Sequence, residues 1–377
     1  RESRESMLSC QRGLAGDLGH TRLKRKPSEG CGRLSSSSAR RAGGSSQTFL
    51  NGFDCFSVMK GFAITSKGIE DIAAAEIKEL ICADCKPEQG CVLFDFKKFE
   101  ELCLLCYKCQ SADRILYWIG EFEFHNFFEE LERFIEKTRF DGWISKCRTF
   151  KVECIRMGDH DFKSVDAEAK VAEILLKKNK GKKLGMKDYD IIFFVYIMGN
   201  NCYFGVDFAG FELNKRPYKI FLHPNSLRGT IAYALIRESG FDKNDTMLDP
   251  FSRDGVIVIE AALHASNFPL NYYKKEKFAF LKLNLVDSGR LLENADKRML
   301  KKPKARLYCF DYMFKHVDYS RKNAKIAGVD KQINFSRVEL EWLDIKFRKE
   351  AVDRIVTNLP SSKNANLDKI YNEFFYQ

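Results

Sequence analysis

Strands and helices alternate regularly in the C-terminal part of the chain, and this alternation constrains the fold more than any other feature. The segments "TMLD", "ARLYCFD", "QINFS" and "AVDRIVTN" each have the composition of a short, buried strand. The helical segments "VIVIEAALHA" and "VDYSRKNAKIAG" separate the first three. Such alternation is typical of a parallel sheet with helices on its faces. The sequence therefore predicts an α/β domain over residues 222–377.

Acidic or amide side chains stand at or just after the end of each strand in this domain. Asp249, Asp311 and Asn358 close three of the strands, and Glu339 follows the fourth. In doubly wound sheets, ligands bind beyond the C-terminal ends of the strands. Asp311 is placed to accept both hydroxyls of a ribose, and Asp249 to face an ammonium group. Gly255 opens a helix where a ligand can approach the backbone. The pattern indicates a site for a nucleoside-type cofactor.

Two smaller α+β units precede this domain. Over 59–120, strands and amphipathic helices such as "GIEDIAAAEIKEL" predict a ferredoxin-like layer. Over 121–212, helices and strands are followed by "DIIFFVYIMGN" and "NCYFGVDF", which predict a hairpin. Residues 213–221 then read as a linker.

Residues 1–58 differ in composition from the rest of the chain. The stretch "CGRLSSSSARRAGGSSQ" is of low complexity and has no hydrophobic period with which to bury a core. This segment contains 10 Lys and Arg against 5 Asp and Glu, so much of the net charge of +11 lies here. We interpret 1–58 as a disordered extension or an artefact of gene prediction. Its charge is therefore not evidence for a nucleic-acid partner.

Thirteen cysteines lie mostly within apolar runs, and no such run approaches the roughly 18 residues of a membrane span. The spacing of Cys82, Cys85, Cys103 and Cys106 fits a zinc-ribbon template. However, Cys103, Cys106 and Cys109 recur at helical spacing beside leucines, which favours buried thiols. We therefore predict no metal site and no membrane association, and we predict a reducing, cytoplasmic location.

Several motifs carry a resemblance to a known family. "TMLDPFSRDGVIVIEAAL", "YCFD" and "VTNLP" resemble motifs of class I S-adenosylmethionine-dependent methyltransferases. "FKVECIRMGDHDFKSVDAEAKVAEIL" and "CYFGVDFAGFELNKRPYK" resemble a THUMP domain and its exit. Over 60–377 the chain is similar to THUMP-containing tRNA guanine-N2 methyltransferases, most like the archaeal type that acts in the acceptor stem. The resemblance implies S-adenosylmethionine as cofactor, tRNA as partner, a THUMP domain over 121–212 and a Rossmann-like sheet after it.

The resemblance also implies a role for each candidate residue of the cofactor site. Asp249 would lie near the methionine part of the cofactor, Asp311 on its ribose and Glu339 near its adenine. Gly255 would form the turn from loop to helix. The complete set of cofactor candidates is Asp249, Pro250, Gly255, Asp311 and Glu339.

The candidates for catalysis are Asn358, Leu359 and Pro360. The resemblance implies that the Asn358 side chain and the Leu359 carbonyl accept hydrogen bonds from the guanine amino group, which aligns its nitrogen with the methyl donor. Such a transfer needs positioning and electrostatics rather than a metal or a covalent intermediate. The base must leave its stack to reach the site.

The sequence departs from the family pattern at two places. Arg253 stands in a loop that is commonly richer in Cys and Gly; it could pair with the cofactor carboxylate, but a solvated loop charge is the favoured interpretation. Ser361 follows Asn358-Leu359-Pro360 where an aromatic residue would stack on the base. Losing one such stack costs about 1–3 kcal/mol, which predicts a weakened enzyme rather than an inactive one.

The candidates for RNA binding are Arg156, His160, Lys163, Lys182 and Lys183. Contact there would follow RNA shape and backbone rather than base identity. Two alternatives stay open. His160 could be an ordinary turn residue, and the lysines around 177–187 could be a solvated surface.

Four strands are predicted before Gln377, whereas sheets of this class have seven. We therefore expect a C-terminally truncated sheet, in a fragment of a longer protein, with an uncovered inner strand. The sequence gives no sign of an obligate protein partner. The leading hypothesis is a tRNA guanine-N2 methyltransferase. The alternative is a THUMP-type RNA-binding protein whose methyltransferase domain is inactive or fragmentary. Methylation of ribosomal RNA, or of adenine in DNA, is a further alternative.

Overall fold

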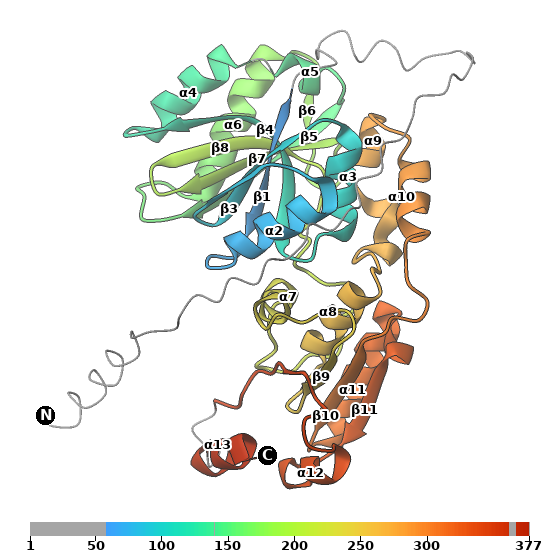
Figure 1. Ribbon diagram of the computed structural model, residues 1–377. Coiled ribbons are helices and arrows are strands. Elements are labelled where there is room, and N and C mark those ends of the chain that lie inside the picture. The colour runs from blue at the N-terminus through green and yellow to red at the C-terminus, as the bar shows by residue number, and fades with distance from the viewer. Residues whose placement is uncertain (1–57, 139, 362–366, 377) are drawn as a thin grey trace, which may run out of the picture. The chain divides into compact units, whose positions relative to one another are not determined.

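A computed structural model of the chain describes residues 58–138, 140–361 and 367–376 (Figure 1). The extension predicted over 1–58 lies almost wholly outside these residues. None of the helices described is long and apolar enough to cross a membrane.

The first part of the described chain forms one eight-stranded sheet in the order β2-β3-β1-β4-β8-β7-β5-β6. Its strands are β1 (Met59–Thr65), β2 (Cys85–Glu88), β3 (Cys91–Phe96), β4 (Ala112–Glu123), β5 (Thr149–Met157), β6 (Lys183–Leu184), β7 (Ile191–Met198) and β8 (Asn201–Asp207). The ferredoxin-like strands and the strands after them are joined where β4 pairs antiparallel with β8, from Leu116↔Asp207 to Glu123↔Asn201. The border expected at residue 120 thus falls inside a strand that both units share.

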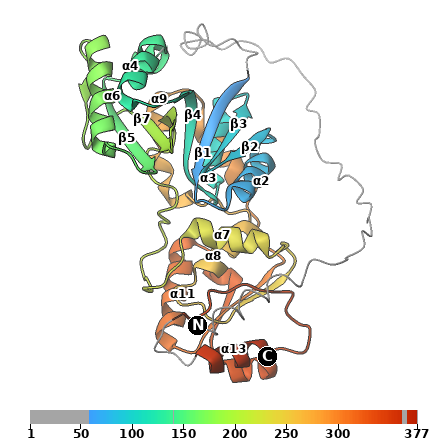
Figure 2. The same cartoon turned by 90° about the vertical axis from the view of Figure 1, so that its left-hand side faces the viewer.

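The main core of this sheet lies on one face, beneath its helices. The helices are α2 (Glu70–Ile81), α3 (Phe99–Lys108), α4 (Phe127–Lys137), α5 (Asp141–Ile144) and α6 (Ser164–Lys178). Figure 2 shows α4 and α6 side by side next to β5 and β7. Along β7, Phe193 and Val195 belong to the main core, whereas Ile192, Phe194 and Tyr196 belong to a cluster on the opposite face. This is the two-residue period of a strand that is buried on both sides.

The C-terminal part forms a second sheet in the order β11-β10-β9-β12, with all strands parallel. Its strands are β9 (Thr246–Asp249), β10 (Arg306–Asp311), β11 (Ile333–Arg337) and β12 (Arg354–Ile355). Its helices are α7 (Gly229–Glu238), α8 (Val256–Ala265), α11 (Phe314–Ala327), α12 (Leu343–Lys346), α13 (Leu367–Tyr376) and the short η3 (Asp330–Gln332) and η4 (Leu340–Trp342). The strand order reverses beside β9, as in doubly wound sheets. The predicted fold class is confirmed.

The segment between α8 and β10 packs on the first unit, which the sequence did not predict. It contains η2 (Tyr272–Lys277), α9 (Phe280–Leu283) and α10 (Ser288–Asp296). The backbone N–H of Ala279 donates to the Ala209 carbonyl at 3.0 Å, and Phe278 and Leu292 are part of the main core of the first unit. The segment therefore ties the two sheets together.

The cysteines of the zinc template do not form a metal site. Cys103 and Cys106 are buried in α3, and Cys82 is exposed just after α2. Burial raises the pKa of Cys85 to about 11. Within 58–138, 140–361 and 367–376, no group of three or more His, Cys, Asp or Glu side chains could hold a metal, and the ten cysteines are all free. The buried thiols predicted at Cys103, Cys106 and Cys109 are confirmed.

Candidate active site

A pocket of about 710 Å³ opens where the parallel strands end. Its walls come from the loop after β9, the residues after β10 and β11, the chain after β12, helix α13 and the segment before α7. Of the predicted site residues, Asp311, Glu339 and Pro360 line it. Asp249, Pro250, Gly255, Asn358 and Leu359 are not among its lining residues. The volume suits a ligand of small-molecule size.

The loop between β9 and α8 is held from behind by buried polar residues of α11. Ser320 Oγ donates to the Arg253 carbonyl at 3.3 Å, and Asn323 Nδ2 donates to the Asp254 carbonyl at 3.0 Å. Gly255 adopts a φ of +78°, and a Cβ there would lie 2.7 Å from the Cβ of Ser320. The conformation and the close approach of α11 both require glycine. The loop is thus fixed before any ligand arrives.

Asp311 already has several hydrogen-bond partners. Its Oδ2 accepts from the Arg253 backbone N–H at 3.0 Å. Its Oδ1 accepts from the Met313 N–H at 2.9 Å and contacts His316 Nδ1 at 3.0 Å. A carboxylate offers about four acceptor positions, so about one is left. Asp311 can therefore accept both ribose hydroxyls only if one of these partners, such as the side chain of His316, moves away.

Two histidines that were not predicted from the sequence line the pocket. The rings of His223 and His316 lie edge to face, with centroids 4.9 Å apart. Burial, together with the charges of His316 and Arg253, lowers the pKa of His223. The only sequence signal was the placement of His316 five residues after Asp311, in the first turn of the following helix.

Asp249 lies beneath the pocket and joins the first strand to the fourth. Its Oδ1 accepts from Thr357 Oγ1 at 2.6 Å and from the Phe251 N–H at 3.2 Å. Burial raises the pKa of this carboxyl to about 7, and the hydrogen bond from Thr357 opposes that rise. The side chain is 1% exposed, so its contact with a ligand ammonium stays a prediction.

The structure contradicts the interpretation of Arg253 as a solvated loop charge. Its side chain is buried, and its backbone adopts a left-handed φ of +53°. Nη1 donates to the Asn225 carbonyl at 3.2 Å, and Nη2 donates to the Leu359 carbonyl at 3.1 Å. Asn358 Nδ2 donates to the same Asn225 carbonyl at 3.1 Å. Three loops therefore meet at the predicted catalytic residues.

Helix α13 covers the side of the pocket next to Ser361. Tyr371 Oη donates to the Pro360 carbonyl at 2.6 Å, and the Phe374 ring lies 5.9 Å from that of Phe251. Ser361 itself lines the pocket. Phe374 packs on the loop after β9 and is not among the residues that line the pocket, so it does not supply the aromatic surface that Ser361 lacks.

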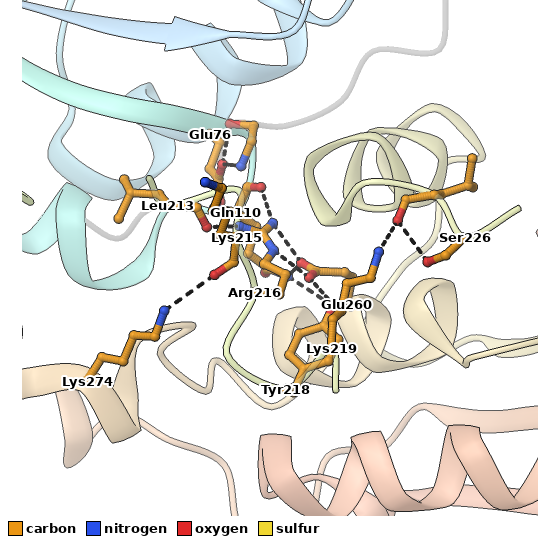
Figure 3. Close-up of polar contacts among 12 residues, drawn as sticks. Glu76, Gln110, Leu213, Lys215, Arg216, Tyr218, Lys219, Ser226, Glu260 and Lys274 are labelled. Atoms are coloured by element: carbon orange, nitrogen blue, oxygen red, sulfur yellow. Dashed lines mark hydrogen bonds and ion pairs between the residues drawn. The ribbon is translucent and has the colours of Figure 1, made fainter. Parts of the chain in front are cut away.

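A buried ion pair connects the linker to α8, the helix that Gly255 begins, and hydrogen bonds of Gln110 extend it to the first unit (Figure 3). Arg216 Nε contacts Glu260 Oε1 at 2.8 Å, and both side chains are fully buried. Gln110 Nε2 donates to Glu260 Oε2 at 2.7 Å, while the Gln110 N–H donates to Glu76 Oε1 at 2.9 Å. The network therefore runs from α2 through the linker to the helix behind the pocket.

Three of the predicted RNA-binding side chains, those of Arg156, His160 and Lys182, are held by internal contacts. His160 Nε2 contacts the Gly199 carbonyl at 2.7 Å and its Nδ1 contacts Arg156 Nη1 at 3.0 Å, so His160 fixes a turn. Lys182 Nζ donates to the carbonyls of Cys147 and Ser145. Lys163 and Lys183 are exposed. RNA contact at these positions stays a prediction.

Arg156 lines a different cavity, of about 800 Å³, between the first sheet and the linker. Lys67, Lys215 and Arg228 line it as well. The other four RNA-binding candidates do not, so the structure does not bring the five together.

Comparison with known proteins agrees with this architecture. Residues 60–116 match an RlmL ferredoxin-like domain, 125–207 a THUMP domain and 216–377 an RMKL-like methyltransferase domain. The chain is 26% identical over 332 residues to a tRNA (guanine(6)-N2)-methyltransferase of Methanocaldococcus jannaschii, which covers 84% of this chain and 86% of the relative. It is 24% identical to the protein of the same name from Archaeoglobus fulgidus, over 84% of this chain and 79% of the relative.

The solved structure of SMU.472, a putative methyltransferase complexed with SAH, has a similar fold. The TM-score is 0.70 at 22% identity, over 84% of this chain and 85% of that one. The resemblance found in the motifs is thus confirmed at the level of domains. The chain is a THUMP-domain protein with an N-terminal ferredoxin-like domain and a C-terminal RMKL-like methyltransferase domain.

Proposed function

We propose that this protein is an S-adenosylmethionine-dependent tRNA guanine-N2 methyltransferase. One observation carries the proposal: the pocket at the strand ends has Asp311 and Glu339 on its walls and the chain Asn358-Leu359-Pro360 at its edge. The names of the two archaeal relatives support tRNA as the substrate and guanine 6 as the target. This target agrees with the acceptor-stem activity that the motifs imply. A tRNA substrate and the buried thiols support a cytoplasmic location.

The residues at the strand ends fit S-adenosylmethionine. Asp311 and Glu339 supply acceptors for ribose and adenine groups on one side of the pocket. Asp254, in the loop after β9, is not among the lining residues of the pocket, but its buried Oδ2 has no hydrogen-bond partner among the described residues and could accept from an ammonium group that reaches this loop. The cofactor, when bound, supplies an electrophilic methyl group on a sulfonium.

The chain itself would position the guanine amino group. Because Asn358 Nδ2 donates to the Asn225 carbonyl, the Oδ1 of the same amide is the atom that can accept from the guanine amino group. The Leu359 carbonyl can accept the second amino hydrogen. Two acceptors on one side orient the nitrogen lone pair to the other side, toward the methyl donor. Catalysis then rests on alignment in a fixed site.

The test is methylation of a tRNA transcript by the full chain, followed by mass spectrometry of the nucleosides. We expect N2-methylguanosine, and we expect Asn358→Ala to lower kcat at least a hundredfold. Asn334→Ala, an exposed residue on β11, is the matched control and should act like the wild type. Formation of methyladenosine would overturn the proposal, and so would an active Asn358→Ala variant.

Calorimetry distinguishes an enzyme from an RNA-binding protein with an inactive domain. We expect S-adenosylmethionine to bind, and Asp311→Ala to abolish that binding, because the carboxylate fixes the Arg253 backbone and faces the pocket. Tight tRNA binding without any cofactor binding would favour the inactive alternative.

A further inference from the structure

A second cavity, of about 420 Å³, lies at the opposite edge of the methyltransferase sheet. Lys243 lies just before β9, Arg298 lies before β10, and His264 is near the end of α8. Because α8 begins at the active-site loop and spans ten residues, the two pockets are separated by about 15 Å along that helix. The second cavity is therefore distinct from the proposed active site.

Positive side chains converge on this cavity from separate elements. Lys108 comes from the end of α3, Lys243 from the loop before β9 and Arg298 from the residues after α10. Burial lowers the pKa of Lys108, and the charges of Lys243 and Arg298 lower it further. Burial and Lys243 also lower the pKa of His264, to about 3, so its imidazole is neutral at pH 7. The cavity thus has a positive potential.

The acidic residues that line the cavity offset these cations only in part, since the charge of Glu76 affects the pKa of Lys108 less than the charges of Lys243 and Arg298 do. Glu79 is paired with Arg237, and its Oε2 accepts from Nη1 at 3.0 Å. Glu76 accepts hydrogen bonds at both oxygens, from Gln110, Ser111 and Cys109. Lys108 Nζ contacts the neutral amide oxygen of Asn267, at 2.5 Å. Within the described residues, neither Lys243 nor Arg298 forms an ion pair.

Another basic cavity adjoins the one of about 420 Å³, and Phe268 lines both. The chain that carries Arg298 continues into this adjoining cavity, where Lys301, Lys302 and Lys331 are lining residues. A half-buried lysine between two further cations is unfavourable unless an anion offsets the repulsion. Lysine and arginine side chains that converge in a hollow are a common arrangement for binding phosphate groups.

We propose that the cavity formed by Lys108, Lys243 and Arg298 is a binding site for a phosphate group. The group is carried either by a small phosphorylated molecule or by the backbone of an RNA chain that continues along Lys301 and Lys302. The neutral His264 adds a hydrogen-bond donor to the same cavity. The RNA source rests on the proposed function, whereas the small-molecule source does not.

The first arm of the test titrates the full chain with inorganic pyrophosphate at low ionic strength. The variant combines Lys243→Gln with Arg298→Gln; both residues are exposed, so the fold should be retained. Lys297→Gln removes the same kind of charge one residue away, outside the cavity lining, and is the matched control. For a small phosphorylated ligand, we expect saturable binding that weakens at least tenfold in the double variant only.

The second arm measures tRNA binding against salt concentration with the same three proteins. For RNA backbone contact, we expect the slope of log K against log salt to fall by up to about 2 in the double variant. The proposal is overturned if neither arm distinguishes the double variant from Lys297→Gln. In that case the cations would only stabilise the C-terminal end of α8 by their interaction with the helix dipole. Cofactor titration of the same proteins is independent of the cavity, so its failure would contradict the proposed function alone.

Discussion

Arg253 Nη2 donates a 3.1 Å hydrogen bond to the Leu359 carbonyl, which joins the loop after the first strand of the methyltransferase sheet to the loop after the fourth. The two residues are 106 positions apart in the chain. The carbonyl concerned is the one that the guanine amino group is proposed to use. The hydrogen bond from Arg253 therefore fixes the direction in which the Leu359 carbonyl points.

We expect Arg253→Ala to lower kcat/KM for tRNA by about ten- to a hundredfold, because the loss of a charge-assisted hydrogen bond of about 1.5–3 kcal/mol releases the Leu359 carbonyl. Arg253→Lys, which keeps the charge but not the two-pronged donor, should be intermediate. Steady-state kinetics with tRNA checks this. Higher activity in Arg253→Ala would show instead that the arginine competes with the substrate for the carbonyl.

The ion pair of Arg216 and Glu260 should matter for stability rather than for chemistry. Glu260→Ala leaves a buried guanidinium unpaired, for which we expect a loss of about 3–5 kcal/mol in the free energy of unfolding. Glu293→Ala, an exposed change on α10, is the control. Urea denaturation measures both.

A double variant tests whether the unpaired buried charge of Arg216 causes the loss of stability expected in Glu260→Ala. Replacing Arg216 and Glu260 together with Met removes both buried charges, and we expect it to recover most of the lost stability. If the double variant is less stable than Glu260→Ala, the hydrogen bonds that Arg216 donates to the Leu213 and Gln110 carbonyls stabilise the fold more than the unpaired charge destabilises it.

The strand ends could be predicted from the sequence, because the apolar runs are short and the carboxyl ends of parallel strands share one edge. That reasoning selected Asp311 and Glu339, which line one pocket together with Pro360, a residue that the family resemblance indicated. The burial of Arg253 could not be predicted, since it depends on carbonyls at positions 225 and 359 that only the fold brings near.

The joining of the two N-terminal units could not be predicted either. The pairing of β4 with β8 links residues about 90 positions apart, such as Leu116 and Asp207, and no local pattern encodes it. The docking of the segment after α8 likewise depends on the surface of another unit, where Asn271 Nδ2 reaches the Cys106 carbonyl at 3.0 Å.

Asp249 should make the stability depend on pH. Burial raises the pKa of its carboxyl from 3.8 to about 7, so between these values the folded state holds a proton that the unfolded state has released. Its contribution therefore favours the folded state at low pH and is lost as the pH rises from about 4 to about 7. Asp249→Asn keeps the acceptor for Thr357 but cannot ionise.

Thermal or urea unfolding at several pH values checks this expectation. The stability of Asp249→Asn relative to the wild type should increase from pH 4 to pH 7 and then level off. A relative stability that is constant over this range would show that the Asp249 carboxyl is ionised throughout in the folded protein.

Ser361 lines the pocket where an aromatic ring would contact the base, so Ser361→Tyr should raise kcat/KM for tRNA. One base–aromatic stack contributes about 1–3 kcal/mol, which corresponds to an increase of up to about a hundredfold. Ser361→Leu adds apolar bulk without a flat ring and is the matched control. The expected order of kcat/KM in methylation assays is Tyr above Leu and Leu near Ser. A decrease with Tyr would mean that the serine leaves room the base requires, and that Asn358-Leu359-Pro360-Ser361 is a working variant of the motif.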